Sequence, residues 1–473
     1  MLNNKAFTFI KNFSYTLSSN LISLIISTVL VFIVPKLIGV EDYGYWQLYL
    51  FYSFYVGFLH FGWNDGIYLR YGGKEYKELN KELFFSQFWM LMLSQIVIGA
   101  IIIGISMIFT ADANRLFILE MTALCMLIVN VRLMLVYILQ STNRIKEYAQ
   151  ITMMERVIYC VLILLCLLIG IRQFKLLIVT DLIAKFIAFV YAMYCCRDIV
   201  FNKISTFTFN VGETAKNINA GIKLMFANIA SMLIIGIVRF GIERSWDVST
   251  FGKVSLVMSV SSLMMVFIDA VGIVMFPVLR RTSEDKLPEL YTTMRITLMV
   301  PLLGLLIVYY PLEVILPAWL PKYSQSLMYM ALLFPMCIYE GKMALLINTY
   351  LKTLRKEKLM LVFNLASVAL SLILTLLFTM VFKSLSLAIV SIVILLAFRS
   401  ALAEVFLSKF LHVSVFKDTF LELAMTVIFI LAGWFVTSWF GLVLYLAAYG
   451  LYLLIQRKEI KATLQTVKQL VRR

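Results

Sequence analysis

The segment FFSQFWMLMLSQIVIGAIIIGISMIF, residues 84–109, carries no charged side chain and is longer than the roughly 20 apolar residues that one membrane-spanning helix needs. Comparable segments recur along the whole chain of 473 residues, of which 62% are hydrophobic and only 14% are charged. The mean hydropathy of +0.92 lies outside the range of soluble domains. These features predict an all-α, polytopic membrane protein.

Fourteen such segments can be marked, six before the longest polar connection and eight after it. They lie at about 13–34, 45–68, 84–109, 117–140, 150–170, 177–195, 223–242, 254–278, 292–316, 326–350, 359–381, 386–407, 419–436 and 442–456. We therefore predict about 14 transmembrane helices, arranged as two pseudo-symmetric six-helix bundles followed by two further helices.

This plan sets the expected domain limits. They are 1–200 for the N-terminal bundle, 201–222 for a cytoplasmic connection, 223–412 for the C-terminal bundle, 413–456 for helices 13 and 14, and 457–473 for a basic cytoplasmic tail. The tail has apolar residues on one helical face and basic residues opposite, which predicts an amphipathic helix, with a disordered tail as the alternative.

The basic residues support the same plan. With the N-terminus in the cytoplasm, 27 Lys and Arg fall in cytoplasmic loops and tails and 9 fall in the opposite loops. The net charge of +16 is therefore a topology signal, and we expect no nucleic-acid binding. We predict a multi-pass protein of the bacterial or archaeal cytoplasmic membrane, with both termini in the cytoplasm.

The remaining six of the 42 basic residues fall inside predicted spans. They are Arg132, Arg156, Lys185, Arg295, Lys342 and Arg399. A charge near the bilayer centre costs about 2.5–3.5 kcal/mol on insertion scales, so each needs a partner or water. Lys185 follows Asp181 by four residues, the spacing of an intrahelical ion pair. The sequence assigns no role to Arg295 and Arg399.

A weak internal repeat relates the two predicted bundles. An offset of 208 residues aligns helix 1 with helix 7, so that Asn20 meets Asn228 and Ser23 meets Ser231. An offset of 210 places Arg132 on Lys342. Each bundle therefore carries a matched cation, as expected of transporters built from two copies of one bundle.

These positions give the candidate substrate-binding residues: Asn20, Ser23, Asp65, Arg132, Asn228, Ser231, Arg239, Asp269 and Lys342. The polar residues of helices 1 and 7 either line a water-filled lumen or are polar contacts between packed helices. Arg132 and Lys342 either contact an anionic substrate or pair with a carboxylate such as Glu340. Asp65 and Asp269 are lumen acids or helix-end groups.

No pattern for catalysis or cofactor binding occurs. The six cysteines show no CxxC spacing, and neither His60 nor His412 has a metal-ligating neighbour at helical spacing. The chain also lacks a phosphate-binding GxxxxGK[ST] loop. We expect no metal, no cofactor and no enzyme activity.

Three segments resemble a known family: VPKLIGVEDYGYWQLYL (34–50), HFGWNDGIYLRYGG (60–73) and LQSTNRIKEYAQI (139–151). They are similar to the Wzx-type polysaccharide-export flippases of the multidrug/oligosaccharidyl-lipid/polysaccharide superfamily. The resemblance implies two six-helix bundles around a central cavity lined by basic and polar residues. This sequence departs from the pattern at Glu340, which occupies the position that an offset of 208 would give to the counterpart of Arg132.

The resemblance also implies an activity. Such a protein moves an undecaprenyl-diphosphate-linked oligosaccharide from the inner to the outer leaflet by alternating access, for O-antigen, capsule, exopolysaccharide or teichoic acid synthesis. Its expected partners are that lipid, the membrane, a coupled proton or sodium ion, and polysaccharide polymerases and glycosyltransferases.

Two other functions compete with this one. A drug or cation exporter of the same superfamily is expected to carry embedded acids rather than embedded cations in its first bundle. A membrane-embedded oligosaccharide polymerase or ligase is expected to need a substantial outer loop with catalytic Arg or His, and the predicted outer loops are short.

Overall fold

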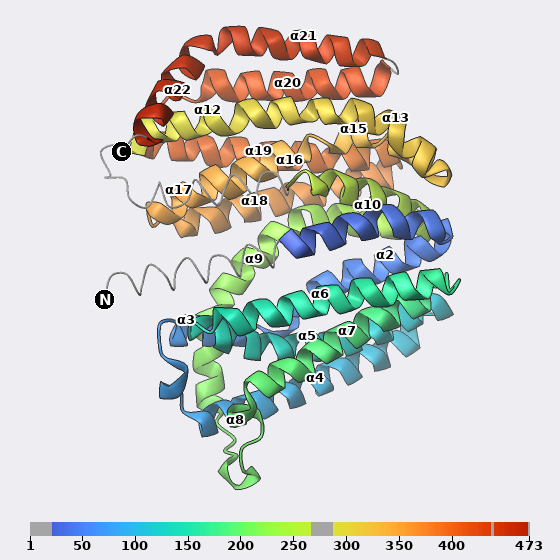
Figure 1. Cartoon of the computed structure of the whole chain (residues 1–473), viewed down its shortest axis with the longest axis vertical. Helices are drawn as coiled ribbons and strands as arrows, with labels where there is room; N and C mark the ends of the chain where they lie inside the picture. The colour runs from blue at the N-terminus through green and yellow to red at the C-terminus, as the bar shows by residue number, and fades with distance from the viewer. Residues whose placement is uncertain (1–20, 266–286, 437–438, 472–473) are drawn as a thin grey trace. The chain divides into compact units, whose positions relative to one another are not determined.

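The computed structural model describes residues 21–265, 287–436 and 439–471 (Figure 1). These residues form helices joined by turns, and no β-strand occurs among them, which confirms the all-α prediction. The chain divides into two compact units, Met1–Ile229 and Ala230–Arg473. The boundary lies inside one long helix, α9 (Val211–Ser245).

The N-terminal unit contains the first eleven described helical elements and the start of α9. They are Leu21–Leu37, α2 (Val40–Tyr55), η1 (Val56–His60), α3 (Trp63–Tyr71), η2 (Tyr76–Glu78), α4 (Lys81–Phe109), α5 (Ala113–Ser141), α6 (Ile145–Leu168), α7 (Phe174–Cys195), α8 (Arg197–Val200) and η3 (Ile204–Thr206). Helix α5 contacts α2, α3, α4, α6 and α7 and so forms the centre of this unit.

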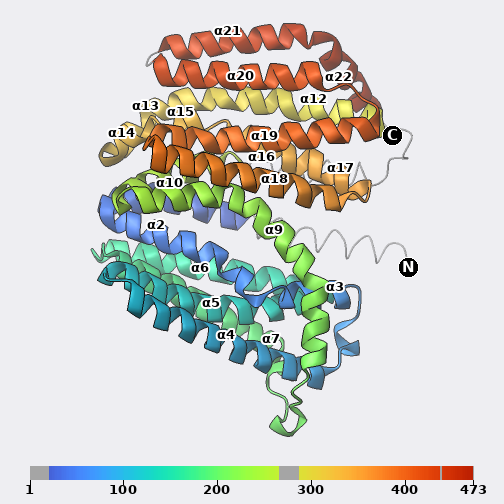
Figure 2. The same ribbon diagram turned by 180° about the vertical axis from the view of Figure 1, so that it is seen from behind.

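The C-terminal unit begins within α9 and ends with α22. Its elements are α10 (Val248–Leu263), α12 (Leu287–Leu305), η5 (Leu306–Val308), α13 (Tyr309–Trp319), η6 (Pro321–Tyr323), α14 (Ser324–Leu327), α15 (Met330–Leu333), α16 (Met336–Gly341), η7 (Lys342–Ile347), α17 (Asn348–Thr353), α18 (Glu357–Leu376), η8 (Leu377–Val381), α19 (Leu385–Leu411), α20 (Phe416–Phe435), α21 (Trp439–Ile455) and α22 (Arg457–Val471). Figure 2 shows α20, α21 and α22 together at one edge of this unit.

Ten described helices are long and apolar enough to cross a membrane, or eleven if the bent pair α21–α22 is one span. Two shorter apolar helices, Leu21–Leu37 and Val248–Leu263, overlap the predicted spans 13–34 and 254–278. Large apolar side chains such as Leu93, Ile101 and Ile108 of α4 are exposed, as expected of helices that face lipid. The protein is therefore a multi-pass membrane protein, and the count of fourteen spans stays a prediction.

The predicted span 45–68 is wrong as one continuous helix. The chain runs through α2 and η1, breaks, and then starts α3. The break occurs because Phe61 and Gly62 adopt left-handed backbone conformations with φ of 53° and 82°. A right-handed helix cannot continue through two such residues. The Gly62 N–H donates a hydrogen bond to His60 Nδ1 at 3.1 Å, which supports the break.

Helix α9 begins at Val211, well before the predicted start of span 7 at residue 223. Its early turns cross α3 at glycines, where the two backbones touch. A Cβ atom on Gly66 would overlap the carbonyl oxygen of Asn217, and one on Gly221 would overlap the carbonyl oxygen of Gly62. Because this stretch packs on α3, residues that read as a polar connection become helical.

Two described elements, η7 and η8, are π-helices, a rare form that is often found at functional sites. The tail forms a helix, α22, which contacts α12 and bends by 64° from α21. The helical alternative for the tail is therefore the one observed.

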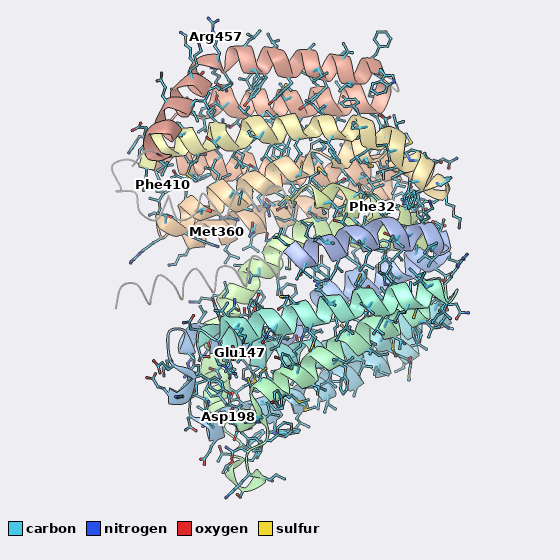
Figure 3. All side chains as sticks on the ribbon, in the orientation of Figure 1. Phe32, Glu147, Asp198, Met360, Phe410 and Arg457 are labelled. Carbon is cyan, nitrogen blue, oxygen red and sulfur yellow. The ribbon has the colours of Figure 1, made fainter. Side chains whose placement is uncertain are left out.

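Loops that the charge rule places in the cytoplasm meet at one end of the N-terminal unit. The Tyr76 hydroxyl donates to Asp198 Oδ1 at 2.6 Å, Lys81 Nζ lies 3.1 Å from Asp198 Oδ2, and the Arg144 guanidinium lies over the Tyr76 ring. Figure 3 shows Glu147 and Asp198 at this same end. Burial alone would raise the pKa of Asp198, but the donors Tyr76 and Lys81 outweigh it and lower that pKa.

Candidate functional site

The cation predicted to matter in the N-terminal unit, Arg132 on α5, forms an ion pair with Glu155 on α6. Both side chains keep some exposure, 13% for Arg132 and 16% for Glu155. The sequence did not predict this partner. The pair leaves Arg132 partly accessible within the membrane-spanning part of the unit.

A second ion pair lies in the same unit. Lys185 Nζ donates to Asp181 Oδ2 within α7, which confirms the pairing predicted from their spacing of four residues. The Tyr49 hydroxyl of α2 donates to the same oxygen at 2.6 Å. Asp181 is therefore satisfied by two donors, and this group links α2 to α7.

The C-terminal unit contains a larger group of charges, called here the closed cluster: Arg295, Lys342, Asp418, Glu404 and Glu422. Lys342 Nζ contacts Glu404 Oε2 and, at 2.6 Å, Glu422 Oε2. Arg295 contacts Glu404 Oε1 through Nε at 2.8 Å, Glu422 Oε1 through Nη2 at 2.5 Å, and Asp418 Oδ2 through Nη1 at 3.3 Å. The cluster joins α12, η7, α19 and α20.

Glu404 is the carboxylate of the closed cluster with the most donors. Besides Arg295 and Lys342, it accepts hydrogen bonds at 2.8 Å from the Tyr291 hydroxyl and the Thr419 hydroxyl. Four donors therefore surround its two oxygens, and its side chain is 0% exposed.

For Lys342, this cluster matches the pairing alternative, because its side chain is only 1% exposed. Its partners are Glu404 and Glu422, not Glu340. Sequence reasoning missed both carboxylates, although each lies in a predicted span. A search of the predicted spans for Asp and Glu, like the one that identified the six basic residues, would have found them.

Arg399, which the sequence could not place, lies on α19 and forms a more open group. Its Nη2 lies 3.1 Å from Glu340 Oε1 of α16, and its Nη1 donates to Ser231 Oγ of α9 at 3.1 Å. The Arg399 side chain is 3% exposed, whereas that of Glu340 is 26% exposed. Ser231, a candidate from the repeat, is thus placed beside a cation.

The other candidates are dispersed. Arg239 donates to Ser255 Oγ at 3.1 Å and lies over the Phe251 ring, while Asn228 is exposed on α9. Ser23 accepts a hydrogen bond at its carbonyl from the Ser27 hydroxyl, as in ordinary helix packing.

Asp65 is a buried residue near the start of α3, and its Oδ2 lies 3.7 Å from His60 Nε2. Asn20 and Asp269 lie outside the described residues. Among the residues described, no three His, Cys, Asp or Glu are arranged to hold a metal ion.

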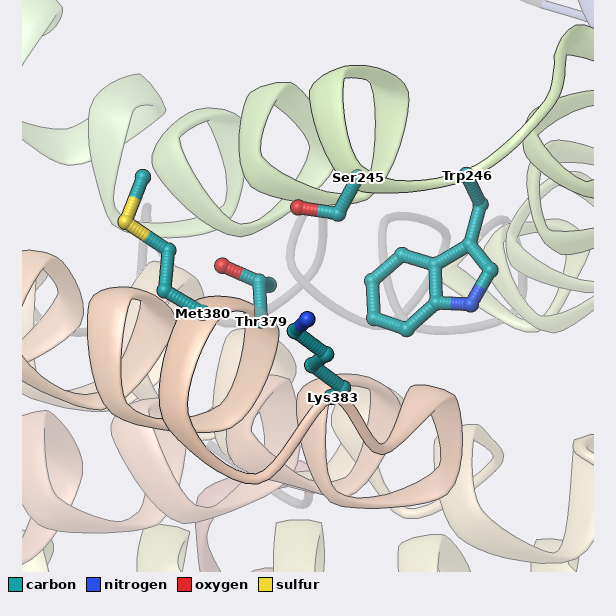
Figure 4. A pocket seen from close by; sticks show the side chains of 5 residues that line it. All are labelled: Ser245, Trp246, Thr379, Met380 and Lys383. Carbon is teal, nitrogen blue, oxygen red and sulfur yellow. The ribbon is translucent and has the colours of Figure 1, made fainter.

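A pocket of about 440 Å³ lies where α9 and η8 end (Figure 4). It is lined by Ser245, Trp246, Thr379, Met380 and Lys383. Figure 4 shows the Ser245 hydroxyl, the Thr379 hydroxyl and the Lys383 ammonium turned toward the same space, with the Trp246 ring at its side. The charge rule places these helix ends on the face opposite the cytoplasm.

The family model for a polysaccharide biosynthesis protein matches residues 33–316. A structure of the lipid II flippase MurJ in an inward closed conformation has a similar fold, with a TM-score of 0.66 and 12% sequence identity over 95% of this chain and 100% of that one. No curated protein sequence matches the chain.

A second solved structure is an inward-facing multidrug resistance transporter of the MATE family, within the MOP superfamily. It matches with a TM-score of 0.52 and 12% identity, over 83% of this chain and 98% of that one. At such identities the likeness to both structures shows the fold.

Proposed function

Because the chain belongs to the polysaccharide biosynthesis protein family, as its resemblance to Wzx-type flippases predicted, we propose that it moves an undecaprenyl-diphosphate-linked oligosaccharide across the membrane. The movement runs from the cytoplasmic to the outer leaflet by alternating access. The membrane is the cytoplasmic membrane, and the glycan serves a cell-surface polysaccharide.

One observation carries this proposal. Arg132, a permanently charged group inside a membrane-spanning helix, keeps partial exposure and pairs with a carboxylate that is also partly exposed. Such a cation suits an anionic diphosphate, because a guanidinium can bind phosphate oxygens through two parallel hydrogen bonds. A purely structural pair would be expected to be closed, as Lys342 and Glu404 are.

Outward movement of an anionic headgroup needs no nucleotide. With an inside-negative potential of about 100 mV, each negative charge that moves outward gains about 2.3 kcal/mol. The headgroup must still be sheltered from the hydrocarbon, and the polar residues inside the units can provide that shelter. We further propose that this movement is coupled to a proton or a sodium ion.

The direct test is transport by the purified protein in proteoliposomes. The vesicles carry a fluorescent undecaprenyl-diphosphate-linked sugar, and a membrane-impermeant quencher reports its fraction in the outer leaflet. The protein is expected to exchange the lipid between leaflets faster than empty vesicles do. Rates equal to those of empty vesicles would exclude this function for that lipid.

In the same assay, Arg132→Ala is expected to slow transport about tenfold or more, because a hydrogen bond to a charged group contributes about 1.5–3 kcal/mol. Arg132→Lys should be milder, since it keeps the charge but loses the paired geometry. Arg115→Ala, which removes a partly exposed arginine near the start of α5, is the control. Recovery of transport in Arg132→Ala, Glu155→Gln would instead assign Arg132 a structural role.

The proposed orientation can be tested separately. A reporter that matures only in the cytoplasm, fused after Arg473, should give signal, because both termini are predicted inside. The same reporter inserted beside Lys383 should be silent. A silent C-terminal fusion that is nevertheless stable and inserted would contradict the predicted topology.

A further inference from the structure

Arg399 lies near the middle of a membrane-spanning helix. It follows the start of α19 at Leu385 by 14 residues, or about 21 Å at the helical rise of 1.5 Å per residue. The preceding residues of α19 carry no charge. A guanidinium at this depth is costly unless it is paired, and it is a functional candidate by default.

Three helices of the C-terminal unit meet at this guanidinium. Glu340 of α16 and Ser231 of α9 each contact one of its terminal nitrogens at 3.1 Å. The third nitrogen, Nε, is buried and has no hydrogen-bond partner in the described part of the chain. The site therefore holds a cation whose donors are not all used.

The closed cluster shows why Arg399 differs from its neighbours. Lys342 lies only two residues after Glu340, yet its ammonium is held by two carboxylates whose side chains are at most 2% exposed. Withdrawing Lys342 or Arg295 would leave two buried carboxylates to share one cation, which is unfavourable. Both cations are held by the same two carboxylates, those of Glu404 and Glu422.

Glu340 is more exposed than Glu404 and Glu422 of the closed cluster. Its side chain is 26% exposed, and Arg399 is the partner the structure shows for it. A carboxylate with that exposure can turn toward water at a much smaller cost than a fully buried one. Among the three embedded cations described in this unit, Arg399 is the one whose carboxylate can be exchanged for another anion.

We propose that Arg399 binds the diphosphate of the lipid carrier in the C-terminal unit, and that Glu340 occupies its guanidinium when the substrate is absent. This inference rests on the proposed function. Substrate binding replaces the contact of Arg399 with Glu340 by paired hydrogen bonds to phosphate oxygens. Return of Glu340 then competes with the diphosphate and promotes release.

The test is a binding measurement that does not depend on the glycan. The full-length protein in phosphatidylcholine nanodiscs is titrated with labelled undecaprenyl diphosphate and, separately, with undecaprenol, which has the same tail and no charge. Arg399→Ala is expected to weaken binding of the diphosphate about tenfold or more, with little change for undecaprenol. Arg399→Lys should fall between, because it keeps the charge without the planar donors.

The distinguishing variant is Glu340→Gln. Because it removes the competing charge, it should tighten diphosphate binding by about two- to fivefold. If the pair were only structural, this variant would leave a buried cation unpaired and would bind no better than the wild type. Unchanged or weaker binding by Glu340→Gln, or unchanged binding by Arg399→Ala, would overturn the proposal.

Lys409→Ala is the matched control, since it removes an exposed positive charge from the same helix. It should leave both affinities unchanged. A wild-type protein that binds undecaprenyl diphosphate no better than undecaprenol would instead contradict the lipid carrier in the proposed function. If the wild type prefers undecaprenyl diphosphate to undecaprenol and Arg399→Ala keeps that preference, only the role of Arg399 is contradicted.

Discussion

Replacing Glu404 by alanine is expected to lower the free energy of unfolding by about 3–5 kcal/mol, the usual cost of removing one partner from a buried ion pair. Glu404 is fully buried and is the shared acceptor for Arg295 and Lys342. Its loss leaves two cations to share Glu422, with Asp418 within reach of Arg295 alone, and removes the acceptor of Tyr291. The apparent unfolding temperature of the purified protein in detergent should fall accordingly.

Two further variants make this test specific. Glu289→Ala removes an exposed carboxylate from α12 and should leave the unfolding temperature nearly unchanged. Combining Glu404→Gln with Lys342→Met removes one charge of each sign and should recover part of the loss. If Glu404→Ala were as stable as Glu289→Ala, the closed cluster would not stabilise the unit.

Replacing Gly66 by alanine is expected to cost about 3 kcal/mol or more, at or above the usual range for overpacking. The added Cβ would overlap the backbone carbonyl of Asn217, and a backbone atom cannot move aside as a flexible side chain can. The crossing of α3 and α9 would have to open. Size-exclusion chromatography should show a large loss of monodisperse protein.

The matched control is Gly104→Ala, because a Cβ atom there meets nothing within 4 Å. This change should keep stability or raise it by up to about 1 kcal/mol, since alanine is the better helix former. Equal yields and unfolding temperatures for the two variants would show that the close crossing of α3 and α9 is not required.

The two charge groups of the C-terminal unit suggest a division of roles. The closed cluster fastens α20 to α12, η7 and α19 through contacts that are almost fully buried. The pair of Arg399 and Glu340 joins α19 to α16 with one partner near the surface. The proposed transport would need both kinds of contact, because the helices must hold together while one bound anion replaces another.

Local properties of the chain determined much of this structure. A run such as residues 84–109 needs no distant partner to become a helix in lipid, because every backbone polar group is satisfied within the segment. The pair of Asp181 and Lys185 follows from helical spacing alone. The all-α fold and the family resemblance therefore could be read from the sequence.

Contacts between distant segments were decided only in the folded chain. Lys342 meets Glu404 and Glu422 from 62 and 80 positions away, and no spacing rule relates residues on different helices. The break at Phe61 and Gly62 and the early start of α9 likewise depend on the packing of α3 against α9. Hydropathy shows which segments enter the membrane, but side-chain packing decides which charges meet there.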